Sequence, residues 1–138
     1  MKKLLASAAA LAMLASAPAA FAAAHASQGV TDTEVVLGSH QDMSGPFAAF
    51  GAPAMQAAQL YFDEVNANGG VHGRQIKLVV EDHGYQVPKA VQAANKLINR
   101  DKVFAMVLAL GTPTNNAVLT QQLKAGIPNM FPLTGARS

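Results

Sequence analysis

Segments whose apolar positions suit a β-strand alternate along the chain with segments whose apolar positions have the spacing of an α-helix. The apolar run at residues 35–38 predicts a buried strand. Residues 52–66 carry apolar side chains at helical spacing, and the core-facing stripe is predicted to be Ala54, Ala58, Tyr61, Phe62 and Val65. "NGG" at 68–70 predicts the end of that helix, and the alternation at 76–80 predicts a second strand.

The second half of the chain repeats this order. A helix is predicted to begin near Pro88 and to end near residues 100–101. The nearly unbroken apolar run at 103–110 is typical of a central parallel strand covered on both faces. A third helix is predicted at 115–124 and a fourth strand at 127–133, although two prolines limit its hydrogen bonding.

Strict alternation of strands and helices predicts an α/β fold, a doubly wound parallel sheet with right-handed crossovers. Ligands of such sheets bind beyond the carboxyl ends of the strands. The candidate loops are therefore those that follow the predicted strands, at 39–51, 82–88, 111–115 and 134–138.

Residues 1–26 are predicted to be a signal peptide that directs export to the periplasm and is then removed. Two lysines precede an apolar run from Leu4 to about Ala17, and small residues follow. Both 20–22 and 24–26 fit a cleavage site. The apolar run is too short for a membrane span, which needs roughly 20 residues.

Charge and cysteine usage narrow the function classes. Two of the ten Lys and Arg residues lie in the predicted signal, which leaves eight against eight Asp and Glu. A neutral chain without basic clusters argues against nucleic acid or an anionic membrane as partner. The absence of cysteine means no disulfide and no lipid-bearing cysteine after the signal.

Hydroxyl side chains in the candidate loops offer two interpretations. Ser44, Thr112, Thr114 and Thr134 could hold a small carboxylate together with helix N-terminal N–H groups, or they could cap the helices. Composition and spacing do not decide between these alternatives.

Enzyme and cofactor signatures are thin. There is no G-x-S-x-G, no G-x-x-x-x-G-K-[ST] and no dinucleotide fingerprint between a strand and a helix. His40, His72 and His83 lack a metal-ligand spacing and are predicted to be solvated loop residues. Glu81 and Asp82 are predicted to cap or to serve at the surface rather than to act as acid and base. We therefore expect no cofactor, no metal and no catalytic residue.

Several stretches, taken in order, resemble the periplasmic branched-chain amino acid (Leu/Ile/Val) binding protein family. They are "VVLGSHQDMSGPFAAFG", "AAQLYFDEVNANGGVHGRQIKLVVEDHGYQVPKAVQAANKLI", "VFAMVLALGTPTN" and "GIPNMFPLTGA". The resemblance implies a two-lobed receptor for an ABC importer, monomeric at full length, which closes around a solute between its lobes. Family members are much longer, so residues 27–138 are expected to be the N-terminal part of the first lobe.

The resemblance also implies a set of ligand contacts. The "SGP" turn brings Ser44, Gly45 and the turn amides to the polar end of the ligand, and Phe50 covers its side, while Phe47 could pack there or in the core. The two later loops contribute the remaining positions, which are Leu110, Gly111, Thr112, Leu133, Thr134 and Gly135. The family often has Tyr or Trp at the Phe50 position, and family hydroxyls are shifted or replaced in the later loops. The solute is expected to be a branched-chain amino acid or a similar small amino acid, carboxylate or amide, and these departures leave aromatic acids open as well.

Two other functions stay open at this point. The first is a secreted enzyme on a similar sheet, in which His83 or Asp82 acts beside Ser44. The second is a receptor-like sensory domain of a signalling protein. Downstream sequence separates them, because a catalytic partner residue favours the enzyme and a membrane-spanning helix favours the sensor.

Overall fold

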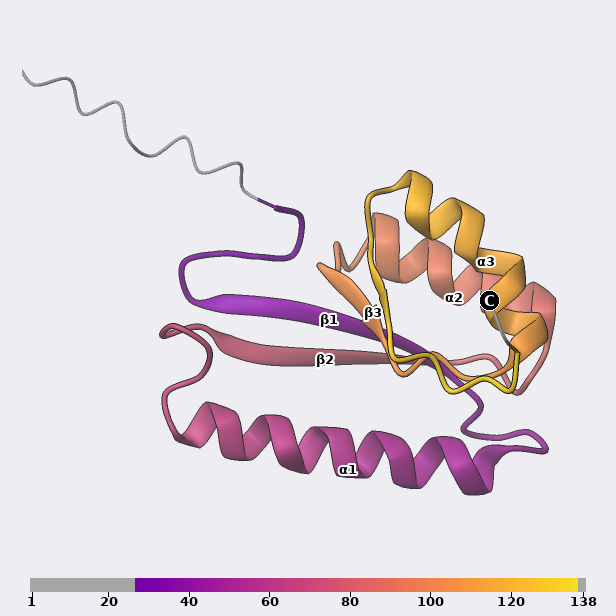
Figure 1. The fold of residues 1–138 in the computed structure, drawn as a ribbon, viewed down its shortest axis with the longest axis horizontal. Helices are drawn as coiled ribbons and strands as arrows, with labels where there is room; N and C mark the ends of the chain where they lie inside the picture. The colour runs from indigo at the N-terminus through magenta and orange to yellow at the C-terminus, as the bar shows by residue number, and fades with distance from the viewer. Residues whose placement is uncertain (1–26, 137–138) are drawn as a thin grey trace, which may run out of the picture.

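The computed structural model describes residues 27–136, which build a four-stranded parallel sheet flanked by helices (Figure 1). The predicted signal peptide lies outside the described residues. The elements are β1 (Glu34–Gln41), α1 (Ala48–Ala67), β2 (Gln75–Asp82), α2 (Val87–Asn99), β3 (Ala105–Val107), α3 (Thr112–Lys124) and β4 (Asn129–Met130). The predicted order of strands and helices is confirmed.

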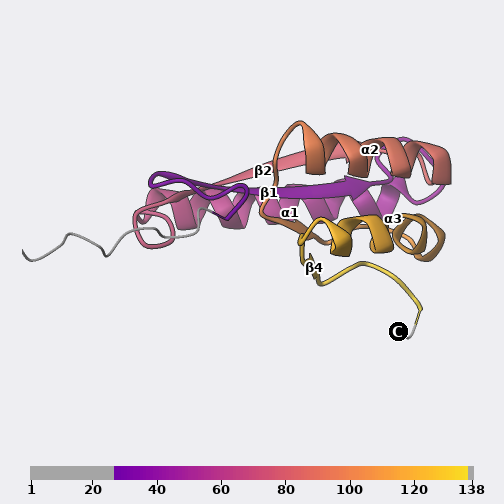
Figure 2. The same ribbon diagram turned by 90° about the horizontal axis from the view of Figure 1, so that it is seen from above.

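The sheet order is β2-β1-β3-β4, so the chain reverses direction across the sheet after β2. Figures 1 and 2 show α1 on one face of the sheet and the packed pair α2 and α3 on the other. A parallel sheet with helices on both faces is the predicted doubly wound architecture. The reversal places the carboxyl ends of β1 and β3 side by side, where such sheets bind ligands.

The buried core lies between the sheet and α2. Leu97 and Ile98 from α2 pack with Val103, Met106 and Ile127. A smaller cluster of Ala90, Ala94 and Val118 joins α2 to α3. Small residues at this second contact allow the two helices to approach closely.

Strand β1 is longer than its apolar run predicts. Residues 39–41 were predicted to start a loop, but they pair with Val80, Glu81 and Asp82 of β2. Their side chains are buried and in part hydrogen-bonded: Ser39 Oγ donates to the Val107 carbonyl over 2.7 Å, and Gln41 Nε2 donates to Ser39 Oγ over 2.8 Å. A polar strand end can be buried here because neighbouring backbone and side chains bind it.

Strand β3 is shorter than predicted. The apolar run at 103–110 contains only three residues of regular strand, and Leu108, with a positive φ of 54°, follows the last of them. The direction of the chain is nevertheless kept. Leu108 N–H donates to the Met130 carbonyl, and a bridge joins Leu110 to Leu133. The loops after β3 and β4 therefore leave the sheet together.

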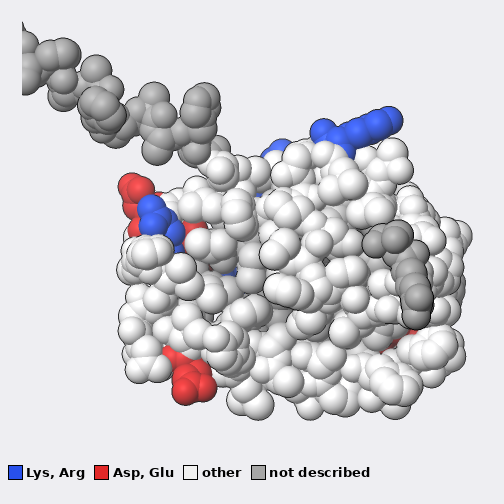
Figure 3. Space-filling view, viewed as in Figure 1, with Lys and Arg blue, Asp and Glu red and all other residues white. Residues whose placement is uncertain are grey.

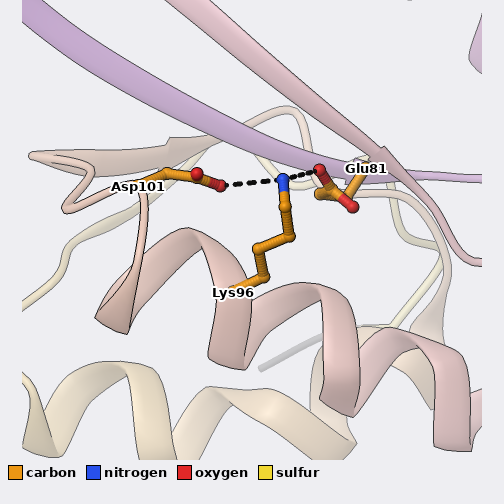
Figure 4. Close-up of polar contacts among 3 residues, drawn as sticks. All are labelled: Glu81, Lys96 and Asp101. Carbon is orange, nitrogen blue, oxygen red and sulfur yellow. Dashed lines mark hydrogen bonds and ion pairs between the residues drawn. The ribbon is translucent and has the colours of Figure 1, made fainter.

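Glu81, predicted to cap or to serve at the surface, has a half-buried side chain that forms an ion pair. Lys96 of α2 pairs with Glu81 at the end of β2 and with Asp101 just after α2, over 3.2 Å to Asp101 Oδ2 (Figure 4). The side-chain hydrogen bonds to Glu81 and Asp101 raise the pKa of Lys96. The ion pair between Lys96 and Glu81 links α2 to β2 and gives the Glu81 carboxylate a partner within the protein.

The face of the sheet next to α1 is only partly covered. Tyr61, predicted to face the core, is 63% exposed, because α1 packs mainly on β2. An apolar groove of about 680 Å³ remains between α1 and the far strands, with Phe104, Met130 and Phe131 among its lining residues. The face shown in Figure 3 is correspondingly uncharged except near its margins. No helix of residues 27–136 is long and apolar enough to cross a membrane.

The groove leads to the first prediction. We expect residues 27–138, expressed alone, to aggregate or to behave as a partly folded chain, because Phe131 is 75% exposed beside other apolar side chains. Size-exclusion chromatography and binding of a hydrophobic dye measure this. A soluble monomer with a sharp two-state unfolding transition would contradict it.

Candidate functional site

A pocket of about 680 Å³ lies at the carboxyl ends of the strands, where the predicted ligand loops meet. Its lining residues are Phe47, Phe50, Ala54, Tyr85, Leu110, Gly111, Thr112, Pro132, Leu133, Thr134 and Gly135. The structure thus brings together seven of the predicted site residues, from the start of α1 and from the loops after β3 and β4. Ser44 and Gly45 are not among the lining residues.

Backbone pairing fixes the two later loops against each other. Gly111 N–H donates to the Leu133 carbonyl over 3.0 Å, and Leu133 N–H donates to the Ala109 carbonyl over 2.9 Å. The hydroxyl oxygens of Thr112 and Thr134 consequently lie 2.6 Å apart. One of these hydroxyls donates to the other, so a single hydroxyl hydrogen of the pair is left for another acceptor.

The "SGP" turn is bound by two aspartates. The buried carboxylate of Asp42 accepts the N–H of Gly45 over 2.5 Å and the N–H of Phe47 over 2.8 Å. Asp82 accepts the Ser44 hydroxyl over 2.6 Å. The turn amides and Ser44 therefore have partners within the protein, and their predicted contact with a ligand stays a prediction.

Asp82 also binds the loop that follows β2. Its Oδ1 accepts the N–H groups of Met43 and Gly84, each over 2.9 Å. Burial alone would raise the pKa of Asp82, but the hydrogen bonds from Ser44, Met43 and Gly84 hold this pKa below its ordinary value. An ionised Asp82 thus fastens the first two ligand loops to each other.

This anchoring positions the aromatic side chains. Phe47 immediately precedes α1 and Phe50 lies in its first turn, and their ring centroids are 6.4 Å apart. Phe47, for which packing in the core and packing at the ligand both remained open, lines the pocket and is 39% exposed. Both rings thus line the pocket, and Asp42 holds the backbone N–H of Phe47.

Tyr85 is a lining residue that the sequence reasoning missed. It stands in the loop between β2 and α2, and its ring centroid lies 4.4 Å from that of Phe47. The signal was present: an aromatic residue in a short loop after a strand, the same feature that drew attention to Phe47 and Phe50. Tyr85 was overlooked because it lies in a stretch rich in turn-forming residues.

The prediction that His40 and His83 are solvated is wrong. Both side chains are fully buried, and their ring centroids lie 5.4 Å apart. His40 belongs to β1, and His83 N–H donates to the Gln41 carbonyl, which extends the pairing of β1 with β2. Of these three histidines, His72 alone is exposed, as predicted.

Burial sets the protonation of this histidine pair. Loss of solvation, with a smaller repulsion from His83, lowers the pKa of His40 to about 4. Burial also lowers the pKa of His83, against the attraction of Asp42 and Asp82. His83 Nδ1 accepts the Tyr85 N–H over 2.9 Å, so the neutral ring helps to hold the loop that carries Tyr85.

Catalytic and metal-binding arrangements find little support in residues 27–136. The Ser44 hydroxyl donates its hydrogen bond to Asp82 rather than to a histidine. Within that range there is no group of three or more His, Asp or Glu side chains placed to hold a metal ion. The hydroxyl of Thr114 is buried and donates to the carbonyls of Leu110 and Gly111, which excludes it from the pocket.

Comparison with known proteins adds a family match. The model of a family described as "Periplasmic binding protein" matches residues 34–137. The chain is similar to an "Amino acid binding protein" of Pseudomonas aeruginosa, with 36% identity over 74 residues that cover 54% of this chain and 20% of the relative. It is also similar to the Leu/Ile/Val-binding protein of Escherichia coli K12, with 35% identity over 57 residues that cover 41% of this chain and 16% of the relative.

Two solved structures extend the similarity over more of the chain. The branched-chain amino acid transporter substrate binding protein of Streptococcus pneumoniae, in complex with isoleucine, matches with a TM-score of 0.72 and 30% identity over 77% of this chain and 30% of that one. A fatty acid ABC transporter substrate-binding protein from Thermomonospora curvata matches with a TM-score of 0.67 and 39% identity over 79% and 27%. The chain thus spans about a fifth of these curated relatives and under a third of these structures.

Proposed function

Because the chain belongs to the periplasmic binding protein family, we propose that residues 27–138 form the N-terminal part of the first lobe of a solute receptor for an ABC importer. The receptor works in the periplasm as a monomer and delivers its solute to an inner-membrane permease. It binds a branched-chain amino acid or a similar small amino acid, carboxylate or amide, and it does no chemistry on the solute. Residues 1–26 are its cleaved signal peptide.

The pocket at the carboxyl ends of the strands is the observation that carries this proposal. The loops after all four strands converge there, and none of the side chains that line it is charged. Ser44, Gly45, Phe50, Leu110, Gly111, Thr112, Leu133, Thr134 and Gly135 form the first-lobe half of the ligand site, and a second lobe closes over them. The polar groups that line the pocket suit hydrogen bonding to a solute better than proton transfer.

Ligand-induced stabilisation of the full-length receptor tests the function. A solute that binds only the folded receptor is expected to stabilise it by about 2.7 kcal/mol at a hundred times its dissociation constant. A thermal-shift screen with amino acids, amides, and aromatic and aliphatic acids measures this. Detectable turnover of a compound, combined with no shift from any class, would instead favour an enzyme.

A pair of matched variants ties the shift to the pocket. Thr112→Val removes a lining hydroxyl that bonds to Thr134, whereas Thr120→Val changes an exposed position farther along α3. We expect Thr112→Val to reduce the ligand-induced shift and Thr120→Val to leave it unchanged. Equal shifts in both variants would contradict the placement of the ligand beside Thr112.

A further inference from the structure

Tyr85 is held in the pocket wall by one hydrogen bond of its backbone and two contacts of its ring. Its backbone has a positive φ of 61°, which an N–H···Nδ1 hydrogen bond to His83 supports. One side of the ring packs on Phe47 at a tilt of 48°. Another side lies against Gly111, where an added Cβ would come within 2.6 Å of Tyr85 Cε2. The protein thus accepts a strained backbone and a bare glycine around this ring.

The phenol hydroxyl of Tyr85 takes part in none of these contacts. Among residues 27–136, no hydrogen bond engages it, although the Tyr85 N–H and ring are both bound. The residues that line the pocket therefore offer two hydroxyl donors, one from Tyr85 and one from the pair of Thr112 and Thr134. Two donors suit the oxygen atoms of a carboxylate or of a ring hydroxyl.

The rest of the wall is apolar and rich in rings. Phe50, Phe47 and Tyr85 form a continuous row, with successive centroids 6.4 and 4.4 Å apart. Leu110, Pro132 and Leu133 face the same pocket. The neighbouring aspartates, which could attract an ammonium group, are occupied by the turn amides and Ser44. The wall therefore offers more to a flat apolar group than to the ammonium of an amino acid.

We propose that Tyr85 is a ligand-binding residue, and that its ring, with Phe47 and Phe50, selects an aromatic carboxylic acid over a branched-chain aliphatic amino acid. This inference rests on the proposed receptor function. An aromatic ligand packs on the row of rings in offset or edge-to-face geometry, which adds to the burial of its apolar surface. Tyr85 thereby supplies the hydroxyl that Phe50 lacks, from a different loop.

Calorimetric titration of the full-length receptor tests the ligand class directly. The probes are benzoate, 4-hydroxybenzoate, leucine and octanoate. We expect at least one of the two aromatic acids to bind about tenfold or more tighter than leucine and octanoate. Tighter binding of leucine or of octanoate would overturn the aromatic preference while leaving the receptor function standing. Absence of binding by every class in the wider screen would instead remove the proposed function.

Two substitutions and a matched control test the role of Tyr85. Tyr85→Leu removes the ring and is expected to weaken the aromatic acid by about tenfold, whereas Tyr85→Phe keeps the ring and is expected to weaken it by a smaller factor. Tyr61→Leu makes the same change on the exposed side of α1, outside this pocket, and is expected to leave the affinity unchanged. Thermal melts without ligand show that each variant is folded. Unchanged affinity in both Tyr85 variants would overturn the assignment.

Discussion

Replacement of Gly111 by alanine is expected to lower the free energy of unfolding of the full-length receptor by about 3 kcal/mol. Gly111 has φ 100° and ψ 135°, a region that residues with a Cβ rarely adopt. The new methyl group would also come within 2.6 Å of both Thr114 Oγ1 and Tyr85 Cε2. Backbone strain and collision act together at this position.

Neither neighbour can move away without loss. Thr114 Oγ1 is buried and donates to the carbonyls of Leu110 and Gly111, while Tyr85 is wedged against Phe47. Gly69→Ala is the matched control, since Gly69 has φ 99° and no atom within 4 Å of the added Cβ. We expect this control to cost about 1 kcal/mol, from backbone strain alone.

Denaturant unfolding of the two variants separates collision from strain. The Gly111 variant is also expected to bind the aromatic acid more weakly, because the displaced ring of Tyr85 lines the pocket. The Gly69 variant changes stability without changing affinity. Equal losses of stability in the two variants would show that the space around Gly111 is less restricted than its geometry indicates.

The order of the elements could be predicted because the spacing of apolar residues identifies the buried face of each helix or strand. The ends of the strands could not. Polar Ser39, His40 and Gln41 look like loop residues until β2 is placed beside them, when backbone pairing and contacts with β3 account for their burial. Similarly, the apolar run at 103–110 does not reveal the positive φ of Leu108 that follows β3.

For the candidate site, the position of the loops could be predicted, but the partners of their polar groups could not. Residues after β3 and β4 could be placed in one pocket because parallel strands bring their carboxyl ends to one edge. The partners of the polar groups could not be inferred, since Asp42 and Asp82 bind the "SGP" turn through loop geometry that no spacing encodes. Tyr85 also depended on geometry, because its position comes from His83, Phe47 and Gly111 rather than from a helical or strand period.

Acid is expected to destabilise the receptor through the buried histidine pair. His40 has an ordinary pKa of 6.5 when unfolded and a pKa of about 4 when folded, because burial disfavours its charged form. Between these values the unfolded chain binds more protons than the folded one, so stability falls as the pH is lowered. The full contribution is present above pH 6.5 and is lost progressively down to about pH 4. The shift corresponds to about 3 kcal/mol.

His83 acts in the same direction, since burial lowers its pKa despite the attraction of Asp42 and Asp82. Its protonation would also remove the acceptor for the Tyr85 N–H, so acid is expected to loosen the pocket wall as well as the fold. Denaturant unfolding at pH 7.5, 6, 5 and 4 measures the loss of stability. Titration of the aromatic acid over the same range measures the effect on the pocket.

Two variants assign the pH dependence to the buried pair. Neither ring nitrogen of His40 has a hydrogen-bond partner among residues 27–136, so His40→Leu removes the titrating group at little cost in hydrogen bonds. We expect this variant to show a flatter stability profile between pH 6.5 and 4, while His72→Gln, at an exposed position, follows the parent protein. A His40→Leu profile as steep as that of the parent would assign the acid sensitivity to other groups, of which Asp82, with its lowered pKa, is the first to test.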